Sequence, residues 1–279
     1  LGADHVDEPV ACAKCGEAVL GRDCAHALQA ESTVGHNRIR DAVFDRYGCV
    51  ASAPGERHGF PVGRDFAEAV GYDPAVLDAL PGACSARFTG AGNPQDAVEL
   101  GDGERLLDLG CGAGLDLCCY ARRFGSPQRL AGLDGSREMA GVAREHLAEA
   151  GFPETEVFCT RAETIPLPDD RLDVVTANGI FNLSPDEHAV MKEIARVLRP
   201  GGRLVFAEIV LREAIEDVVR DSIDDWFRCI GGAMLQPDLV SALESHGFES
   251  VEIVSATRNA RTGHATSLCA VVRAVRGND

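Results

Sequence analysis

The sequence predicts an α/β fold class, a doubly wound and mostly parallel sheet with an N-terminal helical cap. From residue 104 onward, short apolar runs alternate with segments of helical period, which is the order expected of β-α-β units. Gly, Pro and Ser fall at the junctions between these segments, where turns and helix ends are needed. A chain of 279 residues is long enough for one such domain and a smaller appendage.

Seven strands are predicted, because seven runs are short, apolar or β-rich, and bounded by turn residues. Five belong to the alternating part of the chain, and two make up its C-terminal end. In chain order they cover residues 105–110, 130–134, 156–160, 172–178, 203–210, 251–256 and 266–275.

Helices are predicted between the strands from their amphipathic period and their capping residues. The segment 184–202 is the clearest: its helix has Ser184 as N-cap and Pro185 at the first helical position, and it ends before Pro200-Gly201-Gly202. Further helical segments cover residues 115–124, 137–151, 213–229 and 237–246.

The first 100 residues lack this alternation. A helix is predicted near 36–46, a loop rich in Gly and Pro over 48–63, and a short helix near 64–80. We therefore expect three parts: a Cys-bearing arm (1–40), a helical cap or substrate lid (41–100) and a core domain (101–279).

Charge and composition limit the partners of the chain. The formal charge is −17, from 27 Lys and Arg against 44 Asp and Glu, so nucleic acids are repelled and a small-molecule substrate is expected. We expect no membrane span, because no apolar run approaches roughly 20 residues, and no secretory signal, because the N-terminus is acidic. The 11 Cys lack the arrangement of a secreted disulfide framework, which predicts reduced thiols and a cytoplasmic protein.

The strongest motif is DLGCGAG, which begins at Asp108 and joins a strand to a helix. Gly110, Gly112 and Gly114 let the backbone approach a ligand, and the helix start offers free N–H groups. A dinucleotide fingerprint would need Gly in place of Leu115, so the spacing favours a ligand without a pyrophosphate. Asp108 can then face an ammonium group of that ligand.

Polar residues at later strand ends extend this candidate cofactor site. Asp134, followed by Gly135, closes the second strand, where a carboxylate can accept both hydroxyls of a ribose. Met139 can cover a face of an adenine ring, although packing on its own helix is an equal alternative. Ala162 and Glu163 follow the third strand and can line the adenine edge.

Asn178 closes the fourth strand at the expected switch point of the sheet, where ligands of open α/β sheets bind. A Gly-rich turn alone also occurs as a simple tight connection. All of these features in order, each at the carboxyl end of a strand, favour S-adenosylmethionine (SAM) as the ligand.

Five segments carry a closer resemblance: RYG (46–48), GNP (92–94), DLGCGAGLD (108–116), NLSPDEHAVMKEIARVLRPGGRL (182–204) and WFRCIGGA (226–233). Through them the chain resembles the class I SAM-dependent methyltransferases and is similar to the arsenite methyltransferase family. The resemblance implies a Rossmann-like, seven-stranded sheet and SAM as cofactor. It also places Tyr47 and Asp116 on the cofactor side.

The resemblance implies thiol ligands for trivalent arsenic, which is soft and thiophilic. Cys229 matches the family Cys, and Cys49 is retained after Tyr-Gly, but Gly179 stands where the family has its central Cys. We therefore expect methyl transfer to a small organic metabolite or to a soft trivalent metalloid. The alternatives are an arsenite methyltransferase with a rearranged thiol site and a non-catalytic, thiol-rich metal- or metalloid-binding protein.

An organic acceptor must lose a proton or present a lone pair. His58 lies in the loop that replaces the family thiols and is the candidate general base, against the alternative of a solvated loop His. Glu208, at the end of the fifth strand, is a second candidate for substrate contact.

The N-terminal arm holds the pair Cys12 and Cys15, followed by Cys24 and His26. Three thiols and an imidazole can form a tetrahedral zinc site. The alternative is a flexible arm with reactive thiols.

Overall fold

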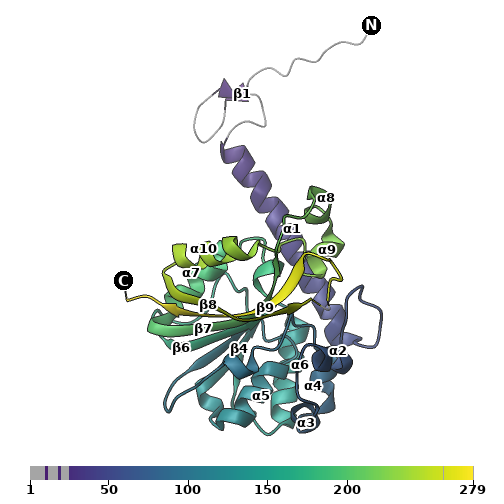
Figure 1. Ribbon diagram of the computed structural model, residues 1–279, viewed down its shortest axis with the longest axis vertical. Coiled ribbons are helices and arrows are strands. Elements are labelled where there is room, and N and C mark those ends of the chain that lie inside the picture. Colours follow the sequence, from purple (N-terminus) through teal and green to yellow (C-terminus); the bar gives the residue numbers. More distant parts are fainter. Residues whose placement is uncertain (1–9, 12–17, 20–24, 260, 279) are drawn as a thin grey trace.

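The chain folds around one seven-stranded sheet, seen in a computed structural model that describes residues 10–11, 18–19, 25–259 and 261–278 (Figure 1). The strand order is β5-β4-β3-β6-β7-β9-β8. The first five strands in that order are parallel, and β9 runs antiparallel to both of its neighbours. The strands are β3 (Leu106–Leu109), β4 (Leu130–Asp134), β5 (Glu156–Cys159), β6 (Leu172–Asn178), β7 (Leu198–Leu211), β8 (Phe248–Arg258) and β9 (Ser267–Arg276).

The predicted doubly wound sheet is confirmed, and its connectivity locates the ligand crevice. Strand β3 pairs with β4 on one side and with β6 on the other, so the chain order reverses at β3. The carboxyl ends of these three strands therefore flank the switch point of the sheet, where open α/β sheets bind ligands.

Helices cover both faces of the sheet (Figure 1). Successive residues of β3 show why both faces are apolar: Leu106 packs into the core on one face and Leu107 into the core on the other. On the Leu106 face lie α5 (Leu115–Phe124) and α6 (Arg137–Glu149), and on the Leu107 face lie α7 (Glu187–Val197) and α10 (Gln236–Ser245).

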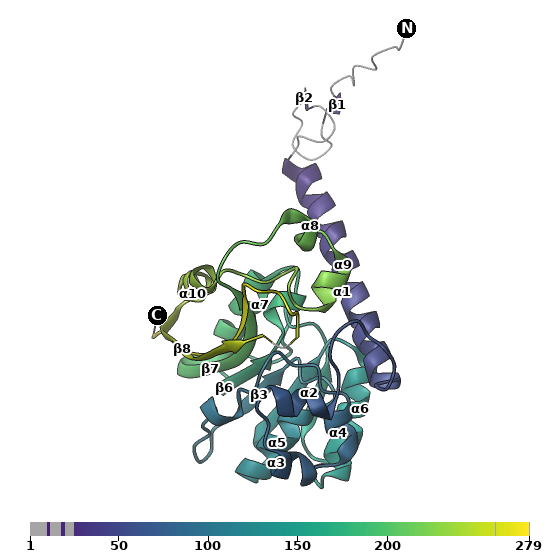
Figure 2. The same cartoon turned by 45° about the vertical axis from the view of Figure 1, so that its right-hand side comes forward.

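The N-terminal part begins with a 28-residue helix, α1 (Ala25–Ser52), which packs along α6 and α9 and extends beyond the body of the domain (Figure 2). The helix predicted near 36–46 is therefore much longer, and the expected boundary at residue 40 falls inside it. The predicted helix 64–80 is divided at Gly71, whose φ of +101° ends the first helical segment. The short helices here are α2 (Arg64–Ala69), α3 (Pro74–Asp78) and α4 (Gly82–Ala86).

The predicted start of the helix at Ser184 is wrong. Helix α7 starts at Glu187, and its N-cap is Asp186, whose carboxylate accepts the Ala189 N–H at 3.0 Å. Ser184 instead donates its hydroxyl to Glu163 at 3.0 Å. The prediction that this helix ends before Pro200 is confirmed, because α7 ends at Val197 and the Pro-Gly-Gly segment belongs to β7.

The region predicted as one helix over 213–229 holds two short ones, α8 (Asp217–Arg220) and α9 (Ile223–Phe227). Among the described residues, no helix is both long and apolar enough to cross a membrane. The remaining elements are the short strands β1 (Val10–Ala11) and β2 (Ala18–Val19) and the 3₁₀ turns Gln95–Ala97, Pro127–Arg129 and Phe181–Leu183.

Candidate active site

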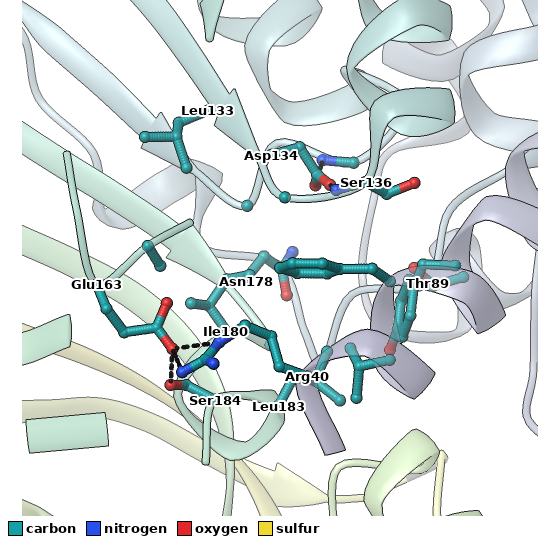
Figure 3. A pocket seen from close by; sticks show the side chains of 18 of the residues that line it. Arg40, Thr89, Leu133, Asp134, Ser136, Glu163, Asn178, Ile180, Leu183 and Ser184 are labelled. Atoms are coloured by element: carbon teal, nitrogen blue, oxygen red, sulfur yellow. Dashed lines mark hydrogen bonds and ion pairs between the residues drawn. The ribbon is translucent and has the colours of Figure 1, made fainter. Parts of the chain in front are cut away.

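A cavity opens at the carboxyl ends of β3, β4 and β6 (Figure 3). It encloses about 730 Å³ of empty space, open mouth included. One wall, the strand-end wall, is made by strand ends and the turns after them. The other, the helix-side wall, is made by α1 and the loop around Thr89. Of the predicted cofactor residues, eight line this larger cavity: Tyr47, Gly110, Gly112, Asp134, Gly135, Ala162, Glu163 and Asn178.

The glycine turn after β3 shapes the floor of the larger cavity. Gly110 and Gly112 have φ values of +71° and +52°, which favour glycine. A Cβ on Gly110 would lie 1.8 Å from the Ile180 side chain, whereas a Cβ on Gly112 would meet nothing within 4 Å. Gly112 therefore faces open space, where a ligand can approach the backbone. Gly114 serves the fold instead. It caps the start of α5, where its backbone packs closely against Ala143 of α6.

Asp134 is held in place by the turn that it faces. Its two carboxylate oxygens accept the N–H groups of Gly112 at 2.9 Å and Ser136 at 2.8 Å. Burial raises the pKa of Asp134 to about 6, although both backbone hydrogen bonds favour the ionised form. The carboxylate is thus oriented before any ligand arrives.

A second cavity of about 360 Å³ lies on the other side of the glycine turn. It shares Thr89, Gly110, Gly112 and Asn178 with the larger cavity, so the two meet along the turn. Asp116 lines only this second cavity, together with Cys84 and Arg87. An elongated ligand can therefore lie across the glycines with one end in each cavity.

Asp116 and Asn178 form a buried polar network at the junction of the two cavities. Asp116 accepts hydrogen bonds from the Tyr72 hydroxyl at 2.6 Å, from Asn178 at 3.1 Å and from Gln95. Asn178 also accepts the N–H groups of Ala91 at 2.7 Å and Gly92 at 3.1 Å. The end of β6 is thereby tied to the loop that precedes the core domain.

Asp108 lines neither cavity and lies beneath them, 2% exposed. One of its oxygens accepts the Thr176 hydroxyl at 3.0 Å, and the other has no hydrogen-bond partner. Burial raises the pKa of Asp108 well above its usual range, and the nearby carboxylates of Asp116 and Asp134 raise it further. Three acidic side chains thus surround the glycine turn with few positive charges to balance them.

Helix α1 contributes residues that the sequence analysis missed. Arg40 and Phe44 line the larger cavity beside Tyr47. Arg40 forms a 2.9 Å ion pair with Glu163, to which Ser184 also donates (Figure 3). A Cβ on Gly135 would lie 2.3 Å from the Phe44 ring, so this glycine lets α1 approach the strand ends. For this wall the sequence offered one signal, the RYG segment at residues 46–48.

Met139, predicted to cover an adenine face, is 1% exposed and lines neither cavity. It packs into the core cluster that joins α6 to α1, where its neighbours include Val43 and Ala113. This agrees with the alternative that it packs within the protein.

The predicted thiols do not converge. Cys229 is fully buried and contacts the Tyr47 hydroxyl, and burial raises its pKa to about 11. Cys49 is exposed and lies two residues after Tyr47 on α1, which turns it roughly 200° away around the helix. Neither Cys229 nor Cys49 lines either of the two cavities, and Gly179 lines the larger one.

The two predicted acid–base candidates are both bound to the backbone. His58 is buried, not solvated, and its Nε2–H donates to the Ala53 carbonyl at 2.9 Å. Glu208 accepts the N–H groups of Phe181 and Ile209, each at 2.9 Å, and burial raises its pKa to about 7. Neither residue lines the larger or the second cavity.

The predicted zinc ligands Cys12, Cys15 and Cys24 lie outside the described residues, and the side chain of His26 is also not described. Within the part that the structure describes, no three His, Cys, Asp or Glu side chains gather as metal ligands.

Comparisons with known proteins agree with this geometry. A family model described as a methyltransferase domain matches residues 100–250. The arsenite methyltransferase of Halobacterium salinarum is 35% identical over 164 residues, which are 59% of this chain and 42% of that protein. The arsenite methyltransferase of Aquipseudomonas alcaligenes is 33% identical over 177 residues, 61% of this chain and 51% of that protein. The chain thus matches about half the length of these relatives.

Among solved structures, an arsenic(III) SAM methyltransferase from Chlamydomonas reinhardtii superposes with a TM-score of 0.59 and 24% identity, covering 74% of each chain. This likeness confirms the fold. The family model covers more than half of the chain and includes the carboxyl ends of β3, β4 and β6, the glycine turn and Asp134. The chain belongs to the methyltransferase domain family.

Proposed function

We propose that this protein binds SAM across the glycine turn and transfers its methyl group to a small acceptor. The observation that carries this proposal is the pair of cavities that meet along Gly110 and Gly112, with Asp134 beside the larger one. An adenosine with an amino-acid tail has the elongated shape that two joined cavities accommodate.

The polar residues fit the parts of that cofactor. Asp134 is oriented to accept both ribose hydroxyls, and Ala162 and Glu163 lie where the adenine edge would be. The amino-acid end would enter the second cavity, near Asp116 and Arg87. Bound SAM supplies a methyl group on a cationic sulfur, and the protein holds that sulfur close to an acceptor.

The acidic residues beneath the turn support a cationic ligand. Burial raises the pKa values of Asp108, Asp116 and Asp134, and among the described residues no positively charged side chain lowers them again. An ammonium or sulfonium in either cavity would stabilise the ionised carboxylates of Asp134 and Asp116, which line the cavities, whereas Asp108 lies beneath them and can act only through its charge. We infer that residues 41–100 act as the lid over the bound cofactor.

The acceptor that we favour is a small organic molecule, because the thiols that a trigonal arsenic site needs are not gathered here. Trivalent arsenic is the second candidate, which the likeness to two arsenite methyltransferases and the matching Cys229 favour. The formal charge of −17 opposes a nucleic-acid acceptor.

Two measurements on the purified protein test this proposal. Calorimetry should show binding of SAM and of its product S-adenosylhomocysteine (SAH); no binding of either would contradict the assigned site. Mass spectrometry should then detect SAH and a methylated product in a panel of small thiols, phenols, carboxylic acids and arsenite. SAM binding without turnover on any of them would favour the non-catalytic binding protein.

Cys229→Ser separates the two acceptors. Methylation of arsenite by the wild type and its loss in Cys229→Ser, at unchanged SAH affinity, would support the arsenic site. Full activity of Cys229→Ser on an organic acceptor would exclude a thiol-dependent mechanism.

A further inference from the structure

Arg261 is a buried arginine behind the helix-side wall of the larger cavity. It lies in the loop between β8 and β9, is 4% exposed, and has its guanidinium 4.7 Å from the centre of the Phe60 ring. Its Nη2 donates to the Tyr47 hydroxyl at 2.7 Å and to the Phe227 carbonyl at 3.0 Å, and its Nη1 donates to the Thr89 carbonyl. The Nε is buried and has no hydrogen-bond partner.

Arg261 forms no ion pair among the described residues. No carboxylate oxygen of the described residues lies within 4.0 Å of the Arg261 guanidinium. The three oxygens that accept its hydrogen bonds are neutral. Glu208 is near enough to influence Arg261, but its pKa of about 7 leaves it only partly ionised at neutral pH. Burial raises the pKa values of Tyr47 and Cys229, so both are neutral as well. Burying a cation without an ion-pair partner costs free energy, which suggests that the position of Arg261 serves a ligand as well as the fold.

The position of Arg261 relates its charge to the cavity. Tyr47 and Thr89, two of its three bonded partners, both line the larger cavity. The strand-end wall opposite carries Asp134 over Asp108 and Asp116, which suits a cationic cofactor. A ligand in the larger cavity therefore has the carboxylate of Asp134 on one side and, behind Tyr47 and Thr89, the guanidinium of Arg261 on the other.

Among the described residues, the helix-side wall offers no free base to remove a proton from an acceptor. His58 donates its Nε2–H to a backbone carbonyl, and both oxygens of Glu208 accept backbone N–H groups. Neither residue lines the cavity. An acceptor with an acidic proton must therefore be ionised when it binds, or become ionised because the site stabilises the anion.

We propose that Arg261 is the charge-compensating residue of an acceptor subsite, which takes a small acceptor whose nucleophilic atom is an anion. This inference rests on the proposed function and narrows its acceptor class to thiolates, carboxylates, phenolates and similar monoanions. The lone pair of the anion forms the new bond to the methyl carbon, and the electrons of the broken carbon–sulfur bond remain on sulfur. No proton has to leave, and the opposite charges of acceptor and cofactor cancel.

The experiment uses the full chain saturated with SAH and three probes of similar size: benzoate, thiophenolate and neutral benzamide. We expect calorimetry to show that the two anions bind at least about tenfold more tightly than benzamide. Equal affinity for benzamide, or no measurable binding of either anion, would overturn the inference. Failure of SAH itself to bind would instead contradict the proposed function, so the two failures are distinguishable.

Variants assign the preference to Arg261. Arg261→Met should abolish the preference for anions and raise the pH at which thiophenol binds, whereas Arg261→Lys should retain most of both effects. The matched control is Arg258→Met, which removes an exposed arginine three residues earlier and should change neither. An anion preference that survives in folded, SAH-binding Arg261→Met would also overturn the inference. If Arg261→Met does not fold, the wild-type probe series and Arg261→Lys decide the matter.

Discussion

The two walls of the larger cavity are built in different ways. The strand-end wall consists of turns whose backbone is fixed by nearby carboxylates, such as Asp134 on Gly112, 22 residues away. The helix-side wall is assembled from side chains far apart in sequence: Arg40 reaches Glu163 across 123 residues, and Tyr47 reaches Arg261 across 214. The first wall is a local motif repeated at strand ends, and the second depends on tertiary packing.

This difference separates the part of the site that the methyltransferase domain family model covers from the part that lies outside it. The strand-end wall presents the glycine turn and Asp134, the proposed ribose ligand, both of which the methyltransferase domain family model covers. Most of the helix-side wall precedes residue 100 and lies outside that model. We therefore expect changes in the strand-end wall to affect cofactor binding most, and changes in the helix-side wall to affect closure and the acceptor.

The largest effect is expected from Asp134→Ala in the strand-end wall. It removes a charged acceptor of two ribose hydroxyls, so SAH affinity measured by calorimetry should fall about 100-fold. Asp102→Ala, which removes an exposed carboxylate of equal charge, is the control and should leave affinity unchanged. A loss of less than about threefold in Asp134→Ala would remove the ribose role from this residue.

The glycines of the same wall should separate binding from folding. Gly112→Ala places a methyl group in the open space that we propose the cofactor occupies, so SAH affinity should fall about 30-fold. The melting temperature should decrease only slightly, because the methyl group meets no protein atom. Gly110→Ala meets Ile180 and should lower the stability by about 2–3 kcal/mol as well. Thermal unfolding and calorimetry on both variants check this; equal stability losses would contradict the packing described.

The pH dependence should have opposite signs for stability and for binding. The pKa of Asp134 in the folded protein, about 6, exceeds its ordinary value of 3.8, so its contribution to stability is present below pH 4 and lost as the pH rises through 6. SAH affinity should rise over that window, because the ionised carboxylate accepts the hydroxyls, by about tenfold per pH unit below 6. Asp134→Asn should lose this dependence; an unchanged profile in that variant would assign it to another group.

The smallest effect is expected at the helix-side wall. Arg40→Met removes the ion pair with Glu163, in which the two side chains are 11% and 13% exposed. SAH should dissociate about three- to fivefold faster, because α1 loses one attachment across the cavity. Arg38→Met, an exposed arginine on the same helix, is the control. A loss as large as that of Asp134→Ala would erase the distinction between the walls.

The strand-end wall could be predicted from the sequence because its signals are local. Asp134 ends an apolar run, and Gly110 and Gly112 stand in a fixed spacing after another, so burial and turn geometry determine where they lie. The seven strands followed from the same patterns. The N-cap at Ser184 was predicted wrongly because Asp186 caps the helix and Glu163, a residue from another strand end, accepts the serine hydroxyl.

Apart from Tyr47, which the RYG segment indicated, the helix-side wall could not be predicted, since no short pattern encodes it. Arg40 and Arg261 are single basic residues in segments of ordinary composition, and their partners are known only once the chain is folded. The positions of Cys49 and Cys229 illustrate the same limit. Both matched a family pattern, yet the turn of one helix directs Cys49 to the surface while Cys229 lies in the core.

The backbone conformation of Gly179 limits which side chains this edge of the larger cavity can carry. Its φ is +77°, and a Cβ there would lie 3.4 Å from the Ala91 nitrogen, which Asn178 also holds. A cysteine reintroduced at this position would start from a backbone conformation unfavourable to it and against an anchored loop. Substitution of Gly179 by cysteine alone would therefore place a thiol at the larger cavity only at the cost of backbone strain, so this position resists the change that a thiol site would need.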